Sequence, residues 1–238
     1  MIHTELLSPQ VSFWKLLKVW QTSYMRLDHV SYVASHDQIS DVVNRIGSQI
    51  GTAFVDGGIH PKFGTRNFTA PLLNGQYIEV VCPLEHPATG ATPFGKAVKK
   101  KADAGGGWLT WVFSSSDLGK LEERFGRKAA DGSRTRPDGS ELKWKQIGVN
   151  DIMGSGELPY FIQWLTEMHP STDGNSVAKI AKIIIADDEQ LADSWFQDEI
   201  KSGLNDVEIK WVKPELNDGG KGIVAVEIIL NDKNVSIS

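Results

Sequence analysis

The sequence predicts an α+β protein in which a β-α-β-β-β unit occurs twice and is followed by a third, divergent unit. Two observations carry this prediction. Short apolar runs typical of strands flank stretches with helical spacing, and the same order of elements starts near residues 25 and 107. We expect the paired units to form a curved mixed sheet. The chain has 238 residues, 40% of them hydrophobic, which is enough for a substantial core.

The first unit is predicted to span residues 25–82. Its elements are a strand at 27–34, a helix at 36–51 with one apolar face, and strands at 52–57, 65–73 and 76–82. Asn74-Gly75 separates the last two strands and is typical of a tight hairpin turn.

The second unit is predicted to span residues 107–168. A strand at 108–114 precedes a helix that opens near Ser116 and runs to 125, and strands follow at 132–136, 142–149 and 158–165. Residues 83–106, with a lysine-rich helical stretch and the first two of three consecutive glycines, are expected to be a crossover linker between the units.

The ends of the chain differ from these units. Residues 177–232 are predicted to be a divergent third unit: a strand at 178–186, a helix at 189–200, and strands at 207–212 and 222–230. Residues 1–24 precede the pattern and contain a short amphipathic stretch. Three interpretations remain open for them, in order of preference: a start site assigned too early, a helix packed on the body, or a partner-binding appendage.

Composition argues against several classes of function. A net charge of -5 provides no broad basic surface, so nucleic acid is not an expected partner. Cys82 is the sole cysteine, which rules out an intrachain disulfide or a cysteine-rich zinc site and favours a reducing, cytoplasmic location. No apolar run is long enough to span a bilayer. Phosphate-binding and dinucleotide-binding glycine motifs are absent, so no nucleotide cofactor is expected.

The repeated unit carries motifs of a known superfamily. With Asp28-His29-Val30 in the first strand and Ile78-Glu79-Val80 in the fourth, it resembles the vicinal oxygen chelate superfamily. A narrower resemblance, to the glyoxalase-like domain family, covers residues 25–168. It rests on the Gly-rich His-Pro segment 57–67, on Arg136-Pro137-Asp138-Gly139, and on 158–164.

That resemblance implies a cup whose concave face binds a small molecule and one divalent metal ion such as Zn, Fe, Mn or Ni. The expected ligands are His29 and Glu79, since a buried carboxylate needs a partner and imidazole binds first-row metals. Aligning Ile78-Glu79 with Ile162-Gln163 adds Gln163 as a third ligand. The second unit departs from the metal-binding pattern, because Leu109 or Thr110 stands opposite His29.

A second group of residues is predicted to bind the substrate. His60, Thr65, Arg66 and Asn67 lie in the Gly-rich connection, and Trp164 lies in an aromatic-rich strand of the second unit. Arg66 is the expected anchor for an anionic substrate, whereas Arg134 is predicted to be a surface charge. No residue is identified as the catalytic acid or base.

The sequence leaves several functions open. The leading interpretation is a metal-dependent lyase, isomerase or dioxygenase acting on a small substrate with neighbouring oxygens. Its main alternative is a metal-free protein that binds or sequesters a small molecule in the same cup. A third interpretation assigns the units to assembly, for instance as a homodimer. Fold resemblance alone does not choose among these functions.

Overall fold

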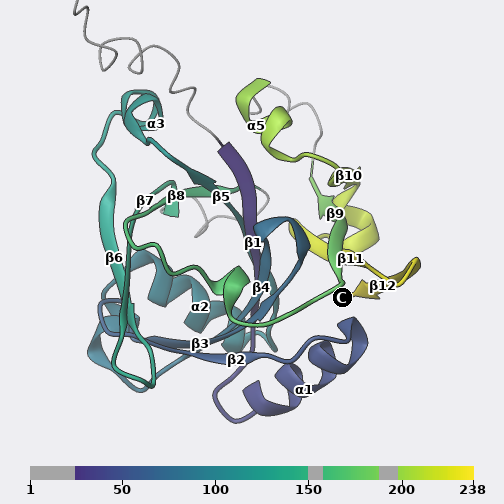
Figure 1. The fold of residues 1–238 in the computed structure, drawn as a ribbon, viewed down its shortest axis with the longest axis horizontal. Helices are drawn as coiled ribbons and strands as arrows, with labels where there is room; N and C mark the ends of the chain where they lie inside the picture. The colour runs from purple at the N-terminus through teal and green to yellow at the C-terminus, as the bar shows by residue number, and fades with distance from the viewer. Residues whose placement is uncertain (1–24, 150–157, 188–197) are drawn as a thin grey trace, which may run out of the picture.

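A closed barrel and a smaller sheet beside it make up the part of the protein that the computed structural model describes (Figure 1). The described residues are 25–149, 158–187 and 198–238. The predicted segment 1–24 and most of the helix predicted at 189–200 lie outside them. The barrel strands follow the order β1-β4-β3-β2-β6-β7-β8-β5.

The first predicted unit is one half of the barrel. Its strands are adjacent in the order β1-β4-β3-β2, so the first strand pairs in parallel with the last. Asn74 and Gly75 both adopt positive φ angles at the turn before the last strand, as the hairpin prediction requires. The elements are β1 (Met25–Val33), α1 (Ile39–Ile50), β2 (Val55–His60), β3 (Thr65–Pro71) and β4 (Tyr77–Pro83).

The second unit repeats this arrangement in the other half. Its strands follow the order β5-β8-β7-β6, again with the first and last strands parallel. The elements are β5 (Gly107–Ser115), α3 (Gly119–Phe125), β6 (Ala130–Thr135), β7 (Glu141–Ile147) and β8 (Tyr160–Trp164). The predicted tandem repeat and its α+β class are therefore confirmed.

Two seams close the barrel. β1 pairs with β5 in an antiparallel ladder along most of their length, whereas β2 meets β6 at the single pair Ile59 and Thr135. The linker between the units contains α2 (Pro93–Asp103), which packs on β1, β4 and β5 and buries Phe94 and Val98. The linker therefore covers the barrel as well as connecting its halves.

The C-terminal residues form a separate four-stranded sheet, consistent with a divergent third unit. Its strand order, β10-β9-β11-β12, differs from that of the first two units, and its last strand was not predicted. The sheet shares an apolar core with the barrel, and the Trp108 indole N–H donates to the Ile237 carbonyl at 2.8 Å. The elements are β9 (Lys179–Ala186), α5 (Asp198–Gly203), β10 (Glu208–Val212), β11 (Gly222–Leu230) and β12 (Lys233–Ile237).

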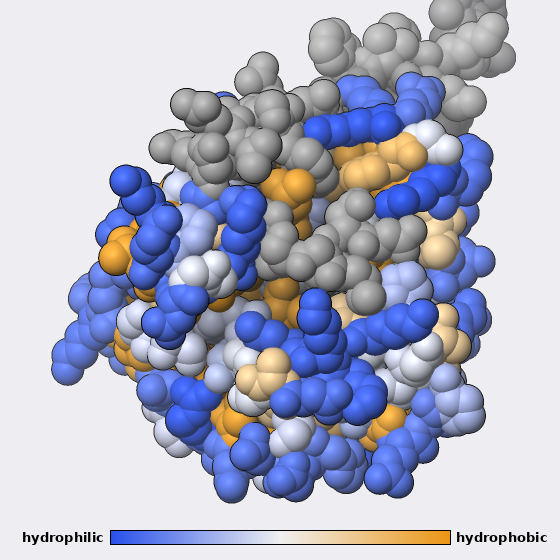
Figure 2. Space-filling model, turned by 180° about the vertical axis from the view of Figure 1, so that it is seen from behind, coloured by the Kyte–Doolittle hydropathy of each residue, from blue (hydrophilic) through white to orange (hydrophobic). Residues whose placement is uncertain are grey.

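On the face shown in Figure 2, hydrophilic side chains predominate and apolar ones form small groups between them. None of the helices in the described ranges combines the length and the apolar character needed to cross a bilayer.

Candidate functional site

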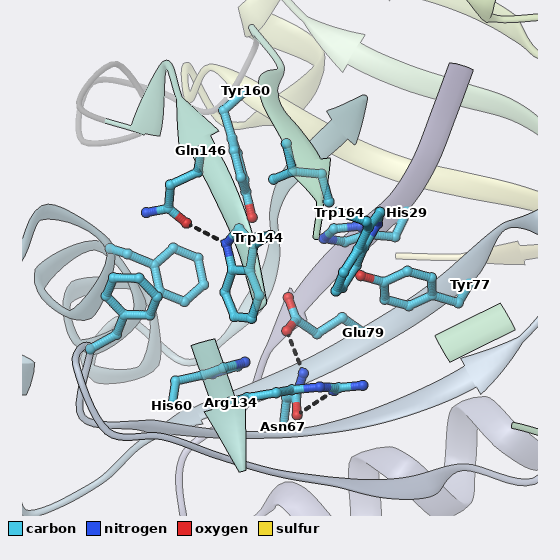
Figure 3. A pocket seen from close by; sticks show the side chains of 13 residues that line it. His29, His60, Asn67, Tyr77, Glu79, Arg134, Trp144, Gln146, Tyr160 and Trp164 are labelled. Carbon is cyan, nitrogen blue, oxygen red and sulfur yellow. Dashed lines mark hydrogen bonds between the residues drawn. The ribbon is translucent and has the colours of Figure 1, made fainter. Parts of the chain in front are cut away.

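Inward-facing side chains of both units enclose a cavity in the barrel (Figure 3). Because alternate residues of a strand face the same side, pairs such as Tyr77 and Glu79 point inward together. The space that these side chains leave between them is small. The lining residues are His29, His60, Phe63, Asn67, Tyr77, Glu79, Phe94, Arg134, Trp144, Gln146, Tyr160, Ile162 and Trp164.

His29 enters the cavity as one member of a buried pair. The β1–β5 register shifts between Leu27 and His29, so Asp28 is the extra residue of a β-bulge. The bulge lets two consecutive side chains meet, and Asp28 Oδ1 lies 2.9 Å from His29 Nδ1. The His29 ring stacks on Tyr77 with 4.4 Å between the ring centroids. Its Nε2 has no hydrogen bond to any described residue.

Asp28 is fully buried yet remains ionised. Burial raises the pKa of its carboxyl, but hydrogen bonds and charge from His169 and His29 outweigh this and hold the pKa well below its usual range. Its Oδ2 lies 3.1 Å from His169 Nε2, 3.2 Å from Arg26 Nη2 and 3.3 Å from Trp164 Nε1. An ionised carboxylate only accepts hydrogen bonds, so His29 Nδ1 donates to Asp28, and Nε2 is the ring nitrogen without a partner among the described residues.

Glu79 lies near His29 in the same cavity, as the sequence predicted. Ser31 Oγ donates to Oε2 at 2.6 Å, and Asn67 Nδ2 donates to Oε1 at 2.7 Å. Burial opposes ionisation, but the nearby His29 and His60 and these two hydrogen bonds bring the pKa of Glu79 below its ordinary value. Both carboxylate oxygens are therefore already engaged by donors.

His60 faces the same space from β2. Its Nδ1 lies 2.9 Å from Thr65 Oγ1, and the rings of Phe63, Phe94 and Trp144 surround it. Burial lowers the pKa of His60 to about 4, so the ring is neutral near pH 7. Thr65 orients His60 and does not itself line the cavity.

The structure reverses the predicted positions of two arginines. Arg66, the expected anion anchor, lies on the outer side, pairs with Asp56 and packs over the Phe68 ring. Arg134, predicted to be a surface charge, is only 2% exposed and lines the cavity. Its Nη1 donates to Asn67 Oδ1 at 2.9 Å. Asn67 thus connects Glu79 to Arg134 (Figure 3).

Aromatic side chains of the second unit form much of the wall. Trp164, which was predicted, and Trp144 line the cavity, whereas Trp108 and Trp111 belong to the apolar core. Burial raises the pKa of Tyr160 well above its ordinary value, as it does for Tyr77. Both phenols therefore stay neutral and can donate a hydrogen bond inside the cavity.

Gln163 is not brought together with His29 and Glu79. Its Nε2 donates to the Ser116 carbonyl at 2.7 Å on the exposed side of β8, and Ile162 and Trp164 face inward instead. The alignment with Ile78-Glu79 misplaced Gln163 by one residue, which reverses the face in a strand.

The side chains present do not fit the metal centre implied by the resemblance. On β8, the side chains that face His29 and Glu79 across the cavity are Tyr160, Ile162 and Trp164, and the one amide of the described second unit that lines the cavity, Gln146, accepts from Trp144. The oxygens of Glu79 accept from Ser31 and Asn67. Within 25–149, 158–187 and 198–238, no three His, Cys, Asp or Glu side chains are grouped as metal ligands. The predicted set of His29, Glu79 and Gln163 is therefore not brought together, because Gln163 lies outside the cavity.

Several cavity residues escaped the sequence analysis although a signal for them existed. Tyr77 lies two residues before Glu79, and Gln146 lies two residues after Trp144, so strand alternation places each beside an inward neighbour. Arg134 follows Gly132 by the same interval. A Cβ at Gly132 would lie 2.3 Å from the Trp144 indole, which identifies an inward-facing glycine.

Comparison with known protein families identifies the family of this chain. The sequence model of the glyoxalase-like domain family matches residues 27–199, well over half of the protein. The chain belongs to the glyoxalase-like domain family. The match extends beyond the predicted range 25–168 into β9 and the start of α5.

Two solved structures are similar to this glyoxalase-like protein at low sequence identity. A hypothetical protein from Staphylococcus aureus is 15% identical with a TM-score of 0.51, and the match covers 89% of this chain and 84% of that one. Methylmalonyl-CoA epimerase from Mycobacterium tuberculosis is 17% identical with a TM-score of 0.41, covering 61% of this chain and 93% of that one. No curated protein matches the sequence significantly.

Proposed function

We propose that this protein binds a small molecule with neighbouring oxygens in the barrel cavity and exchanges a proton with it through His29. The observation that carries the proposal is the 2.9 Å contact between the buried Asp28 carboxylate and His29 Nδ1. It supports a tautomer in which Nε2 is the free, basic nitrogen at the cavity. A histidine held by a carboxylate in this way is a common general base.

The proposed reaction moves one proton at a carbon beside a carbonyl group. Nε2 of His29 takes the proton, and the electron pair of the C–H bond shifts onto the carbonyl oxygen to give an enolate. The neutral phenols of Tyr77 and Tyr160 are available to stabilise this oxygen. The protonated His29 then returns the proton to the same carbon, or to the neighbouring carbon once the hydroxyl proton on that side of the enediol has moved to the former carbonyl oxygen. Both outcomes are isomerase-type chemistry. No metal is required, in keeping with the donor set of the cavity.

A second candidate function is binding without turnover. The rings of Phe63, Phe94, Trp144 and Trp164 support it, because aromatic side chains commonly line the sites that bind small molecules. This function needs the cavity but not the basicity of His29. The two candidates therefore differ in what happens when His29 is replaced.

Exchange of carbon-bound hydrogen for deuterium tests the proposal. In heavy water, we expect the protein to speed the exchange in hydroxyacetone, glyceraldehyde or lactaldehyde, followed by proton NMR. His29→Gln should slow the exchange about 100-fold or more, because the base is lost. His36→Gln, which alters an exposed histidine, should not.

Three results would count against parts of the proposal. If the exchange continues at the same rate in His29→Gln, His29 is not the base. Binding of these compounds without any exchange would favour the second function. Loss of exchange after EDTA treatment, with recovery on adding Zn²⁺, Fe²⁺, Mn²⁺ or Ni²⁺, would instead support the metal-dependent interpretation.

A further inference from the structure

The guanidinium of Arg134 has unused donors inside the barrel. Arg134 is 2% exposed and lines the cavity. Nη1 donates to Asn67, but Nε and Nη2 are buried and have no hydrogen-bond partner among the described residues. Buried charged donors without partners are costly, so their retention needs an explanation.

The unused donors are the pair that recognises a carboxylate. The guanidinium is planar, and Nε–H and one N–H of Nη2 point in the same direction along one edge. Two parallel hydrogen bonds from such an edge match the two oxygens of a carboxylate. In Arg134 the single partner, Asn67, takes Nη1 and leaves this edge free.

Three other arginines in or next to the barrel strands have an acidic partner. Arg26 pairs with Asp28, Arg66 with Asp56, and Arg136 with Asp173. No ion pair of Arg134 occurs within the described part of the chain, although it is the most buried of the four. The nearby Glu79 bonds to Asn67 and not to Arg134. Glu79 therefore favours the charge of Arg134 from a distance, but leaves Nε and Nη2 without a direct acceptor among the described residues.

The backbone is shaped to hold this side chain. The β2–β3 register shifts between Asp56 and Gly58, so Gly57 is a bulge residue. A Cβ at Gly57 would lie 2.3 Å from Arg134 Nη1 and 2.2 Å from Asn67 Oδ1. Only glycine therefore leaves room for the Asn67–Arg134 pair at its present position.

We infer that the ligand of this cavity is a small carboxylic acid whose carboxylate binds Nε and Nη2 of Arg134. This inference rests on the proposed function, because it names the class of molecule that the His29 site takes. Together with the requirement for neighbouring oxygens and the small cavity, it indicates short 2-hydroxy or 2-oxo acids. Their carboxylate and adjacent oxygen would meet Arg134 and the tyrosine phenols.

Matched acid and amide probes test the inference. Glycolate and lactate should bind at least about 10-fold more tightly than glycolamide and lactamide, which have the same shape without the charge, in NMR titrations near neutral pH. Arg134→Lys keeps the charge but loses the parallel donors, and should remove most of this preference. The control Arg66→Lys, on the outer side, should retain it.

A second variant guards against misfolding of the first. Gly57→Ala leaves Arg134 in the sequence but displaces it, so the acid preference should fall, whereas Gly90→Ala, with open space at its Cβ, should leave it unchanged. Acid and amide binding equally to the unmodified protein would overturn the inference and leave cavity binding intact. If no acid or amide probe binds while the exchange in hydroxyacetone, glyceraldehyde or lactaldehyde persists, the inference alone fails. If that exchange is also missing, the proposed function fails with it.

Discussion

At the residue scale, the site is a set of buried polar groups that hold one another. Ser31 and Asn67 fix Glu79, Asn67 fixes Arg134, and Thr65 fixes His60. Such contacts reduce the cost of burying polar groups and hold each side chain in one orientation. The free edge of Arg134 and the Nε2 of His29 have no such hydrogen-bond partner among the described residues, which is why both carry functional proposals.

His60 makes the stability of the folded protein depend on pH. Burial lowers its pKa from 6.5 to about 4 in the folded state, so between these values the unfolded chain binds a proton that the folded protein does not. Stability therefore rises with pH in this window, by about 1.4 kcal/mol per pH unit from this group. This contribution of His60 to the free energy of unfolding is fully present above the pKa of the unfolded chain, and it is lost as the pH falls toward the pKa of the folded protein.

The test compares urea unfolding near pH 7 and near pH 5. We expect His60→Asn, which keeps a partner for Thr65 but does not titrate, to reduce the loss of unfolding free energy by about 2 kcal/mol relative to the unmodified protein. His36→Asn, at an exposed position, should show the unmodified pH dependence. An identical pH dependence in all three proteins would contradict the assignment.

At the element scale, strand alternation and two bulges decide which side chains reach the cavity. Alternation sends Tyr77 and Glu79 inward and Gln163 outward. The bulge at Asp28 brings a consecutive pair together, and the bulge at Gly57 makes room for Arg134. Bulges shift the face of the following residues, so a pattern read by simple alternation fails next to them.

The β2–β6 seam depends on Gly58. Its φ is +94°, and a Cβ there would lie 1.9 Å from the Thr135 carbonyl oxygen, next to the single pair that joins these strands. We expect Gly58→Ala to cost more than about 3 kcal/mol of unfolding free energy in urea titrations. Gly139→Ala is the matched control, with a φ of +84° but open space around its Cβ. It should cost about 1 kcal/mol from backbone strain alone. Equal costs for the two variants would show that the collision does not matter.

At the scale of the whole molecule, the barrel and the C-terminal sheet share one apolar core. Ile183 and Val226 of the sheet belong to the same buried cluster as Leu27 and Phe113 of the barrel. Helix α5 packs on β1, and β11 packs on β5. A sheet that buries its apolar face against the barrel should unfold together with it, because separation would expose that face to water.

A single substitution in the sheet tests this coupling. Ile183→Ala removes a fully buried side chain and should cost about 3 kcal/mol, whereas Ile184→Ala, on the less buried face of β9, should cost less. Tryptophan fluorescence, which includes Trp108 and Trp111 of the barrel, and far-UV circular dichroism should show one coincident urea transition in each variant. A sheet that unfolds separately, with the barrel transition unmoved, would rule out a common cooperative unit.

The sequence by itself determined the repeated β-α-β-β-β order, the α+β class, the family resemblance and the cavity residues His29, His60, Asn67, Glu79 and Trp164. These follow from local signals: apolar periodicity, turn residues and short motifs. The tertiary structure alone decided that Arg134 replaces Arg66 as the buried cation and that Gln163 faces outward. It also decided the strand order of the C-terminal sheet. The reason is physical: a one-residue change of register or a bulge reverses the face of a side chain, and strand pairing is fixed by contacts distant in sequence.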